Sequence, residues 1–361
     1  MSEAKVDLIY NDQNNQIQVE GAVANTFANA PGGLHINNFR PFIGNDGRTY
    51  VNRLVNNQMA AVPVMANAAL RRDEWKLLDE AVLKVSRERL GGVDDLISRG
   101  LTYNMTNAMG RTVFEYHDMN DPGSAGMSMD AIQRGANDAP NYTANYIPLP
   151  IIHADVTYNK RLLEVSRNMG EALDVTMIEA ATRRVLEKRE DLLFTSTSYT
   201  YGGGTIYSYL NHPNVNSVSI TVNWDNVAKT GADIVNQVIA MKTALIGDKN
   251  YGPFQLYVPT AYDTILDKDY STSYTKTIRQ RILEIEGISG VKVIDHLTAN
   301  NVVMVQMTSN VVRLLNGFAP TLVQWETQGG LVLHFKIMCI QVPQLRADYA
   351  GSCGILQATP S

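Results

Sequence analysis

The stretch of sequence that decides the fold runs from Gly252 to Asp348. It opens with Gly252-Pro-Phe-Gln-Leu-Tyr-Val-Pro-Thr-Ala-Tyr-Asp and closes with Met338-Cys-Ile-Gln-Val-Pro-Gln-Leu-Arg-Ala-Asp. Between these ends stand Arg279-Gln-Arg-Ile-Leu-Glu-Ile-Glu-Gly-Ile, Val302-Val-Met-Val-Gln-Met-Thr-Ser and Gln324-Trp-Glu. Apolar and β-branched runs of strand length alternate here with segments of helical spacing, so the stretch predicts a compact block of helices and strands.

Residues 231–307 and 311–342 divide this stretch into two parts. In the first part we expect a helix over 232–246, a buried strand over 254–258 and, after Pro259, a second helix. A third helix over 277–286 and strands at 291–294 and 302–307 complete it. In the second part, Thr327-Gln-Gly-Gly separates strands over 322–325 and 331–342, which predicts a hairpin.

The N-terminal part of the chain has a weaker pattern. Residues 1–72 are rich in Asn and Gln and contain Pro31-Gly-Gly, so we expect an irregular arm. Residues 73–90 predict a helix that Gly91-Gly92 ends, because apolar residues recur at helical spacing, namely at Trp75, Leu78, Val82 and Val85.

Residues 101–159 predict a long protruding hairpin. Gly110-Arg-Thr-Val-Phe-Glu-Tyr alternates like a strand, residues 119–129 read as a flexible tip, and a return strand is expected over 146–158. Pro148 and Pro150 place that return strand at a sheet edge. Two strands without a core are marginally stable in water, so we expect another surface to cover them.

A long helix is expected over 174–195. It carries one apolar stripe, and Tyr201-Gly-Gly-Gly-Thr is expected to end it. The residues of the stripe are Ile178, Ala181, Val185 and Leu192.

The composition disfavours several classes of protein. The net charge is −5, and no Lys/Arg cluster is longer than the pairs Arg71-Arg72 and Arg183-Arg184, which argues against tight, sequence-specific nucleic-acid binding. Cys339 and Cys353 form no C-x-x-C motif, so neither a zinc site nor a redox motif is indicated. The first residues lack the features of a signal peptide, and no apolar run is long enough to span a bilayer, so we expect no membrane segment.

Motifs of catalysis are also missing from the sequence. Gly202-Gly-Gly-Thr lacks the Lys-Ser/Thr of a phosphate-binding loop, and Gly123-Ser-Ala-Gly lacks the spacing of a nucleophile elbow. The acidic residues Asp267, Asp269, Glu284 and Glu286 are typical of any charged helix. We therefore predict no catalytic, cofactor-binding or metal site. The six histidines have no metal-ligand spacing; they are His35, His117, His153, His212, His296 and His334.

The motifs quoted above between Gly252 and Asp348, together with Ile43-Gly-Asn-Asp-Gly-Arg-Thr-Tyr-Val and Leu149-Pro-Ile-Ile-His, resemble the major capsid proteins of tailed bacteriophages. The resemblance covers roughly residues 38–356 and implies the α+β HK97-like capsid fold, which encapsulin shell proteins share. It implies an extended N-terminal arm over 1–72, an E-loop hairpin over 101–159 and an axial domain over 231–307. The peripheral domain would then comprise 73–100, 160–230 and 308–361, with a spine helix over 174–195.

The resemblance also implies a function. The chain would be a non-enzymatic structural subunit that self-assembles, as pentamers and hexamers, into the icosahedral head around a double-stranded DNA genome. It would be located in the virion after assembly in the host bacterial cytoplasm, without a cofactor and without sequence-specific DNA contacts. Portal, scaffold and decoration proteins are the further partners that it implies. Two alternatives stay open: an encapsulin-like compartment shell, and a soluble α/β enzyme with an unrecognised site.

The expected E-loop has a distinctive composition. No lysine occurs between Lys84 and Lys160, so the lysine–asparagine cross-linking known in some shells of this fold is not expected here. Residues 101–159 have six acidic and two basic side chains, a net charge of −4, and five methionines. Methionine adapts to irregular surfaces, so the loop reads as a strap on a neighbouring subunit; a merely solvated loop is the alternative. The expected subunit contacts are Met119, Met127, Met129, Arg111, Arg134 and Asp130.

Overall fold

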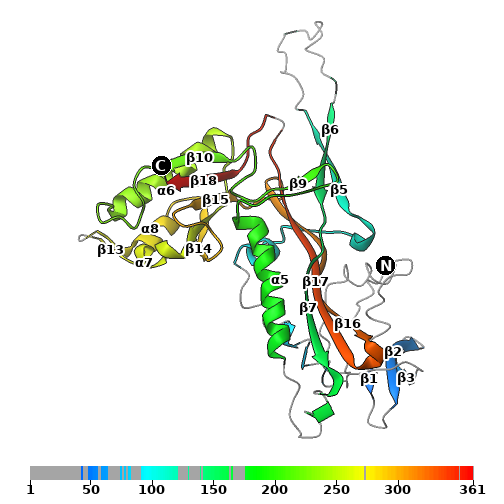
Figure 1. The fold of residues 1–361 in the computed structure, drawn as a ribbon. Helices are drawn as coiled ribbons and strands as arrows, with labels where there is room; N and C mark the ends of the chain where they lie inside the picture. Colours follow the sequence, from blue (N-terminus) through cyan, green and yellow to red (C-terminus); the bar gives the residue numbers. More distant parts are fainter. Residues whose placement is uncertain are drawn as a thin grey trace. The chain divides into compact units, whose positions relative to one another are not determined.

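The computed structural model (Figure 1) describes most of the chain beyond residue 90 and parts of what precedes it. The described residues are 42–43, 48–55, 58–63, 74, 77–78, 80–82, 91–120, 129, 139, 141–161, 164–165, 175–271, 274–348 and 350–360. They fall into two compact units, each built from separate segments of the chain. The first unit comprises Met1–Thr112, Leu149–Asp191 and Leu314–Val342, and the second comprises Val113–Pro148, Leu192–Arg313 and Pro343–Ser361.

The first unit is built around a four-stranded sheet in the order β4-β16-β17-β7. Its strands are β4 (Thr102–Asn104), β16 (Val312–Thr327), β17 (Val332–Leu345) and β7 (Ile152–Asn159). β17 and β7 are antiparallel, with Val332 opposite Asn159 and Cys339 opposite Ile152, whereas β4 is parallel to β16. The predicted strands over 322–325 and 331–342 are therefore confirmed, and both extend beyond the predicted bounds.

The long helix α5 (Thr176–Phe194) confirms the predicted helix over 174–195 and runs alongside β7 and β17 (Figure 1). Its stripe of Ile178, Ala181 and Val185 packs into one core with residues of the sheet, including Phe335 and Ile337. Burial of this stripe removes apolar surface from water, which stabilises the layer by roughly 25 cal/mol per Å². Leu78 and Val82 join the same core, and residues 74, 77–78 and 80–82 are helical, as predicted for 73–90; Trp75 and Val85 lie outside the described residues.

The second unit contains a mixed five-stranded sheet in the order β10-β18-β15-β11-β14. Strand β11 (Phe254–Pro259) is buried at every position, and it pairs antiparallel with the central strand β15 (Val302–Gln306) and parallel with the edge strand β14 (Ile288–Ile294). β18 (Ile355–Pro360) lies between β15 and β10 (Asn216–Ile220). The predicted axial segment 231–307 thus supplies three of the five strands, and the chain on either side of it supplies the other two.

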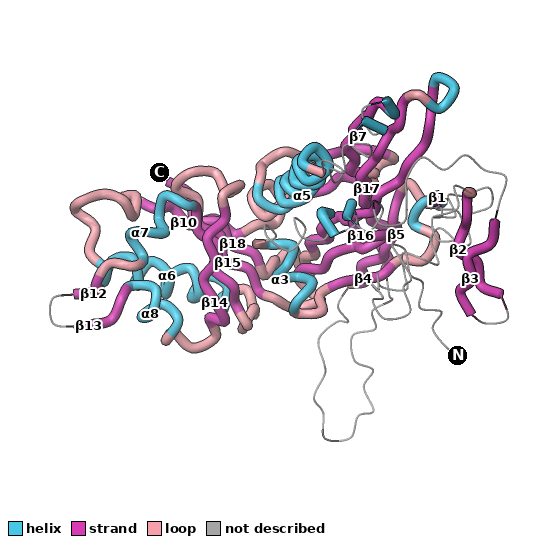
Figure 2. The backbone as a smooth tube through the Cα atoms, turned by 90° about the horizontal axis from the view of Figure 1, so that it is seen from below, coloured by secondary structure: helices cyan, strands magenta, loops and turns pink. Residues whose placement is uncertain are grey.

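Three helices gather beside this sheet (Figure 2). They are α6 (Gly231–Gly247), α7 (Asp263–Leu266) and α8 (Ile278–Leu283), at the predicted places, although α8 is shorter than the predicted 277–286. α6 buries Ile234, Val238, Met241 and Leu245 in one core with strand residues such as Leu256. Thr230 and Thr277 each accept a hydrogen bond from the backbone three residues later, which caps α6 and α8.

The structure corrects three predictions about local structure. The 1–72 arm is not irregular throughout, because β1 (Phe42–Ile43), β2 (Thr49–Val55) and β3 (Gln58–Pro63) form an antiparallel sheet. The strand-forming residues in these segments are few and lie among asparagines, which disfavour strands, so the sequence pattern did not predict them. Gly92 begins helix α3 (Gly92–Ser98), whereas the end of the preceding helix, predicted at Gly91-Gly92, lies outside the described residues. Glu190 accepts hydrogen bonds from the N–H groups of Gly92 and Val93, at 3.3 and 3.2 Å, so a distant residue satisfies this helix start.

The other corrections concern turns. The glycines after Tyr201 do not end α5, which ends at Phe194; they join β8 (Tyr199–Tyr201) to β9 (Gly204–Ile206). Gly202 and Gly203 both have positive φ, 59° and 79°, as a tight hairpin turn requires. The return strand predicted over 146–158 is two strands, since β6 (Tyr142–Pro148) ends at Pro148 and β7 starts at Ile152 in the four-stranded sheet. Prolines cannot donate to a ladder, so Pro148 and Pro150 mark the break.

Two further features complete the described chain. A small hairpin that periodicity did not predict joins β12 (Asp269–Ser271) to β13 (Tyr274–Thr277). Single helical turns occur at Ala108–Gly110, Thr260–Tyr262 and Gln328–Gly330.

Candidate functional site

Hairpin β5–β6 of the second unit has one face that is exposed over most of its length. β5 (Val113–Met119) and β6 (Tyr142–Pro148) pair over their whole length, from Val113 opposite Pro148 to Met119 opposite Tyr142. Alternation along the strands gives the hairpin two unlike faces. Beyond the Val113–Pro148 pair at the base, the six side chains of the outward face are exposed: Glu115, His117, Met119, Tyr142, Ala144 and Tyr146.

The outward face is rich in side chains that are favoured in protein interfaces. Met119 is 53% exposed, Tyr142 63% and Tyr146 42%. Tyrosine and methionine are enriched in interface cores, where large amphipathic side chains bury much area at low entropy cost. The neighbouring hairpin β8–β9 adds exposed Tyr199 and Tyr201.

The inward face is tied to the body of the second unit. Phe114 and Ile147, which are opposite each other, are buried. Further along the strands, the side-chain amide of Asn145 donates to Asp118 at 2.5 Å. Nη2 of Arg346, which follows β17, lies 3.7 Å from the second carboxylate oxygen of Asp118. The inward face of the hairpin is thus both packed and hydrogen-bonded.

β9 packs closely on β6 within this unit. A Cβ atom on Gly204 would lie 2.3 Å from the carbonyl oxygen of Tyr146, a distance that non-bonded atoms do not reach. Only glycine permits this approach of two backbones.

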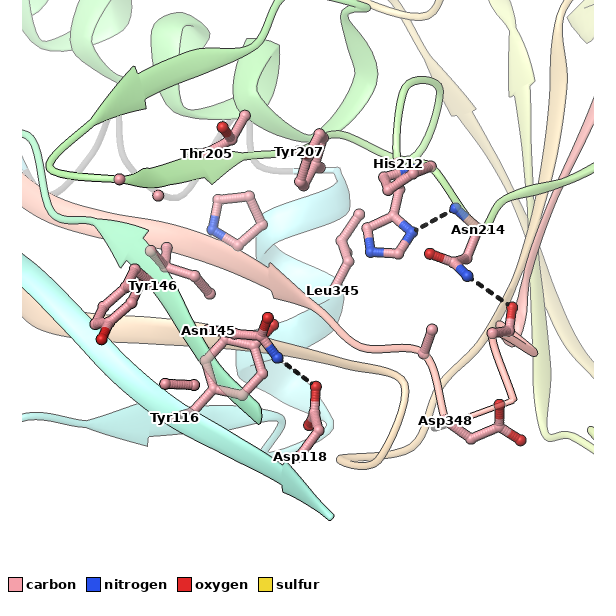
Figure 3. A pocket seen from close by; sticks show the side chains of 18 residues that line it. Tyr116, Asp118, Asn145, Tyr146, Thr205, Tyr207, His212, Asn214, Leu345 and Asp348 are labelled. Carbon is pink, nitrogen blue, oxygen red and sulfur yellow. Dashed lines mark hydrogen bonds between the residues drawn. The ribbon is translucent and has the colours of Figure 1, made fainter. Parts of the chain in front are cut away.

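A polar cavity of about 410 Å³ lies beside the inward face (Figure 3). Its floor includes His212, whose Nδ1 accepts a hydrogen bond from the backbone N–H of Asn214 at 3.2 Å. The Asn214 side-chain amide in turn donates to the carbonyl of Gly351 at 3.0 Å. Other residues around the cavity are Tyr116, Asp118, Asn145, Tyr146, Thr205, Tyr207, Leu345 and Asp348.

Two side chains that line this cavity, His212 and Tyr116, are uncharged at pH 7. Burial lowers the pKa of His212 to about 4, so its imidazole is neutral at pH 7. Burial, assisted by the Asp118 carboxylate, raises the pKa of Tyr116 above its ordinary value, so its phenol stays protonated. A neutral histidine whose Nδ1 already accepts a backbone hydrogen bond serves as a structural member of the wall.

The two cysteines, Cys339 and Cys353, are buried and form no disulfide with each other. Burial raises the pKa of both Cys339 and Cys353 to about 11, so they are thiols at pH 7 and weak nucleophiles. The part of the chain that the structure describes contains no group of three or more His, Cys, Asp and Glu side chains that could hold a metal ion. Within the same ranges, no helix has the length and apolar character needed to cross a membrane.

The structure places only some of the predicted contact residues. Met119 ends β5 and is exposed, Met129 is fully exposed, and Arg111 is exposed just before β5. Met127, Asp130 and Arg134 lie outside the described residues. The role of all six in subunit contacts stays a prediction.

Sequence reasoning missed several residues of this site. Tyr142 and Tyr146 could have been found, because alternation through Tyr142-Thr-Ala-Asn-Tyr146 puts both on one face. Asp118 and Arg346, by contrast, are far apart in the chain, and no local pattern pairs them.

A family model described as "Family of unknown function (DUF6260)" matches residues 65–358 of this chain, which is more than half of its length. The chain belongs to the DUF6260 family. No curated protein sequence matches this DUF6260 chain.

Two solved structures similar to this DUF6260 protein come from a virus-like particle and a capsid. The virus-like particle from Pyrococcus furiosus is 17% identical with a TM-score of 0.57, and the match covers 78% of this chain and 98% of that chain. The capsid of Myoviridae phage XM1 is 11% identical with a TM-score of 0.52, covering 70% of this chain and 86% of that chain. At such identities the likeness concerns the fold, which is the α+β HK97-type capsid fold that the sequence predicted.

Proposed function

We propose that this protein is the major capsid protein of a tailed double-stranded DNA bacteriophage, a subunit that assembles with its own copies into an icosahedral head. The observation that carries the proposal is coverage: the match spans 98% of the chain that forms the Pyrococcus furiosus virus-like particle. A shell subunit is recognised by a whole fold and not by a catalytic cluster, since its work is mechanical.

The outward face of hairpin β5–β6 supports the same proposal. Exposed Met119, Tyr142 and Tyr146 would become buried if a neighbouring subunit lay against them, which suits the strap expected from the sequence. The further contacts that we propose are Arg111, Met127, Met129, Asp130 and Arg134.

The setting follows from this role. The protein would be part of the virion and would assemble in the host bacterial cytoplasm, with a portal, a scaffold or decoration proteins as partners. A net charge of −5 suits a shell that encloses DNA without binding particular sequences.

An encapsulin-like shell is the second candidate, because the virus-like particle of Pyrococcus furiosus has the same fold and is covered almost completely. The contents of the particle separate the two functions. Nuclease-protected double-stranded DNA in particles from the native source supports the phage head, whereas a single protected cargo protein supports the compartment.

The assembly itself is tested by expressing the full chain and examining it by sedimentation and negative-stain microscopy, with any scaffold supplied. Closed particles of uniform diameter are expected. The Met119→Asp variant should form few particles while keeping its circular dichroism spectrum, because a new unpaired charge would have to be buried at the contact. Val227→Asp is the matched control, since Val227 is fully exposed on a loop outside the hairpin.

The possible results bear on different parts of the proposal. Only small species under every assembly condition would count against the shell. Normal particle yield from Met119→Asp would refute the hairpin contact but leave the shell standing.

A further inference from the structure

The inward face of hairpin β5–β6 meets one long cationic side chain from a distant segment. The guanidinium of Arg346 lies 6.0 Å from the ring centroid of Tyr116, and its Nη2 lies 3.7 Å from the carboxylate of Asp118. Tyr116 and Asp118 are two residues apart on β5, so both contacts are on the inward face. Each such contact between partly buried groups is modest by itself, but both act on the same strand.

The backbone of Arg346 is fixed independently of the hairpin. Its N–H donates to the carbonyl of Val311 at 2.8 Å, and its carbonyl accepts from the thiol of Cys353 at 3.6 Å. The next residue, Ala347, forms a bridge with Cys353. The backbone of Arg346 therefore belongs to the body of the second unit, and its side chain reaches the hairpin.

Two observations make this contact more than a surface ion pair. Nε of Arg346 is buried and has no hydrogen-bond partner among the described residues, so the guanidinium is held where one of its donors is not satisfied. The polar cavity lies on the same side of the hairpin, with Asp118 and Asn145 on one wall and His212 on another (Figure 3). An open, polar space beside the inward face leaves room for the hairpin to change its direction.

We propose that Arg346 is the positioning residue of hairpin β5–β6: its guanidinium ties Tyr116 and Asp118 to the body of the unit, and the cavity beside it allows the hairpin to swing when the tie is broken. The tie exists within one chain. Its consequence for assembly rests on the proposed shell function, because the direction of the hairpin would decide which neighbouring surface it meets.

Hydrogen–deuterium exchange of the unassembled full chain tests the proposal. Arg346→Met removes the charge at similar volume, and about tenfold faster exchange is expected in peptides from 113–119 and 142–148, from the loss of both contacts. Peptides from α6 should be unchanged. Asp118→Asn breaks the ion pair but keeps an oxygen for Asn145, and it should give a smaller increase in the same peptides. Arg346→Lys should restore much of the protection.

The chain offers a matched control in Lys336 of β17. Its ammonium also pairs with a carboxylate, Asp155 at 3.5 Å, and lies 5.5 Å from the centroid of Trp325. Lys336→Met removes the same charge and the same two kinds of contact, yet it should leave exchange in the hairpin unchanged. Hairpin exchange within twofold of wild type in both Arg346→Met and Asp118→Asn would overturn the proposal, as would an equal effect of Lys336→Met.

Particle assembly, measured separately, distinguishes the two proposals. If wild type forms no shells but Arg346→Met still loosens the hairpin, the positioning role stands and the shell function fails. If wild type forms shells and neither hairpin variant alters exchange, the shell function stands and the positioning role fails.

Discussion

Arg189 and Glu190 are consecutive residues of α5, and both charged side chains are buried, at 1% and 3% exposure, yet they bind in different directions. Glu190 accepts the N–H groups of Gly92 and Val93 at the start of α3. Arg189 donates through Nη1 to the side-chain oxygen of Gln341 on β17. One turn of helix thus fixes two other elements of the first unit, and this makes both residues sensitive to substitution.

Glu190→Gln should destabilise the protein by about 1–3 kcal/mol, because a charged acceptor of two buried N–H groups becomes a neutral one with a single acceptor oxygen. Urea unfolding followed by circular dichroism measures the loss. Glu187→Gln, at a half-buried position one turn earlier on the same helix, is the control and should lie within about 0.5 kcal/mol of wild type. Equal effects of the two substitutions would contradict the capping role.

Arg189 and Gln341 should be energetically coupled. Burial lowers the pKa of the Arg189 guanidinium, and its Nε and Nη2 have no partner among the described residues, so its desolvation is only partly compensated. Arg189→Met leaves the Gln341 oxygen without a donor, whereas Gln341 keeps its own hydrogen bond to Asn316, at 2.9 Å. A double-mutant cycle with Gln341→Leu should give a coupling energy of about 1–2 kcal/mol. A coupling near zero would mean that the observed hydrogen bond contributes no net stability.

Gly204→Ala should destabilise the second unit by about 1–3 kcal/mol or more, because the new Cβ meets the backbone of Tyr146 and one strand must move. Gly247→Ala is the counterpart. Gly247 ends α6, and a Cβ there meets nothing within 4 Å, so this substitution should be neutral or stabilise by up to about 1 kcal/mol. Thermal unfolding of the two variants decides; similar melting temperatures would refute the close approach of β9 to β6.

His212 should make stability fall as the pH is lowered. Its pKa is about 4 in the folded protein, below the value of about 6.5 expected in the unfolded chain. Above about pH 6.5 both states are neutral and this contribution is fully present. Between about pH 6.5 and 4 the unfolded chain takes up a proton that the folded protein does not, so stability is lost, by about 1–3 kcal/mol in total.

The test for His212 compares urea unfolding of wild type and His212→Asn at several pH values. Asparagine does not titrate, and its side-chain oxygen can accept the N–H of Asn214 as Nδ1 does. The difference in unfolding free energy between the two proteins should therefore shrink or change sign from pH 7 to pH 4.5. Parallel curves over this range would show that His212 titrates normally in the folded state.

Much of the fold could be predicted because it depends on local periodicity. A single buried run predicted β11, the glycines after Thr327 predicted the turn between β16 and β17, and a 3.6-residue period predicted α5. The predicted stripe did not include Thr182 and Arg189, which are buried on the same face as Ile178 and Val185, whereas the predicted Leu192 is only half-buried. The sequence also predicted the capsid fold and an exposed hairpin with Met119 at its end.

Tertiary structure alone decided the remaining relationships. β18 lies between β10 and β15, and no property of residues 355–360 indicates which strands they join, because ladder hydrogen bonds are made by a backbone common to all residues. The contact of Glu190 with the start of α3 and that of Arg346 with Asp118 were not visible in the sequence. Both join segments that are far apart in the chain, and the tertiary fold brings those segments together. Periodicity determines which face of an element is buried, whereas packing between distant segments determines which side chain meets it.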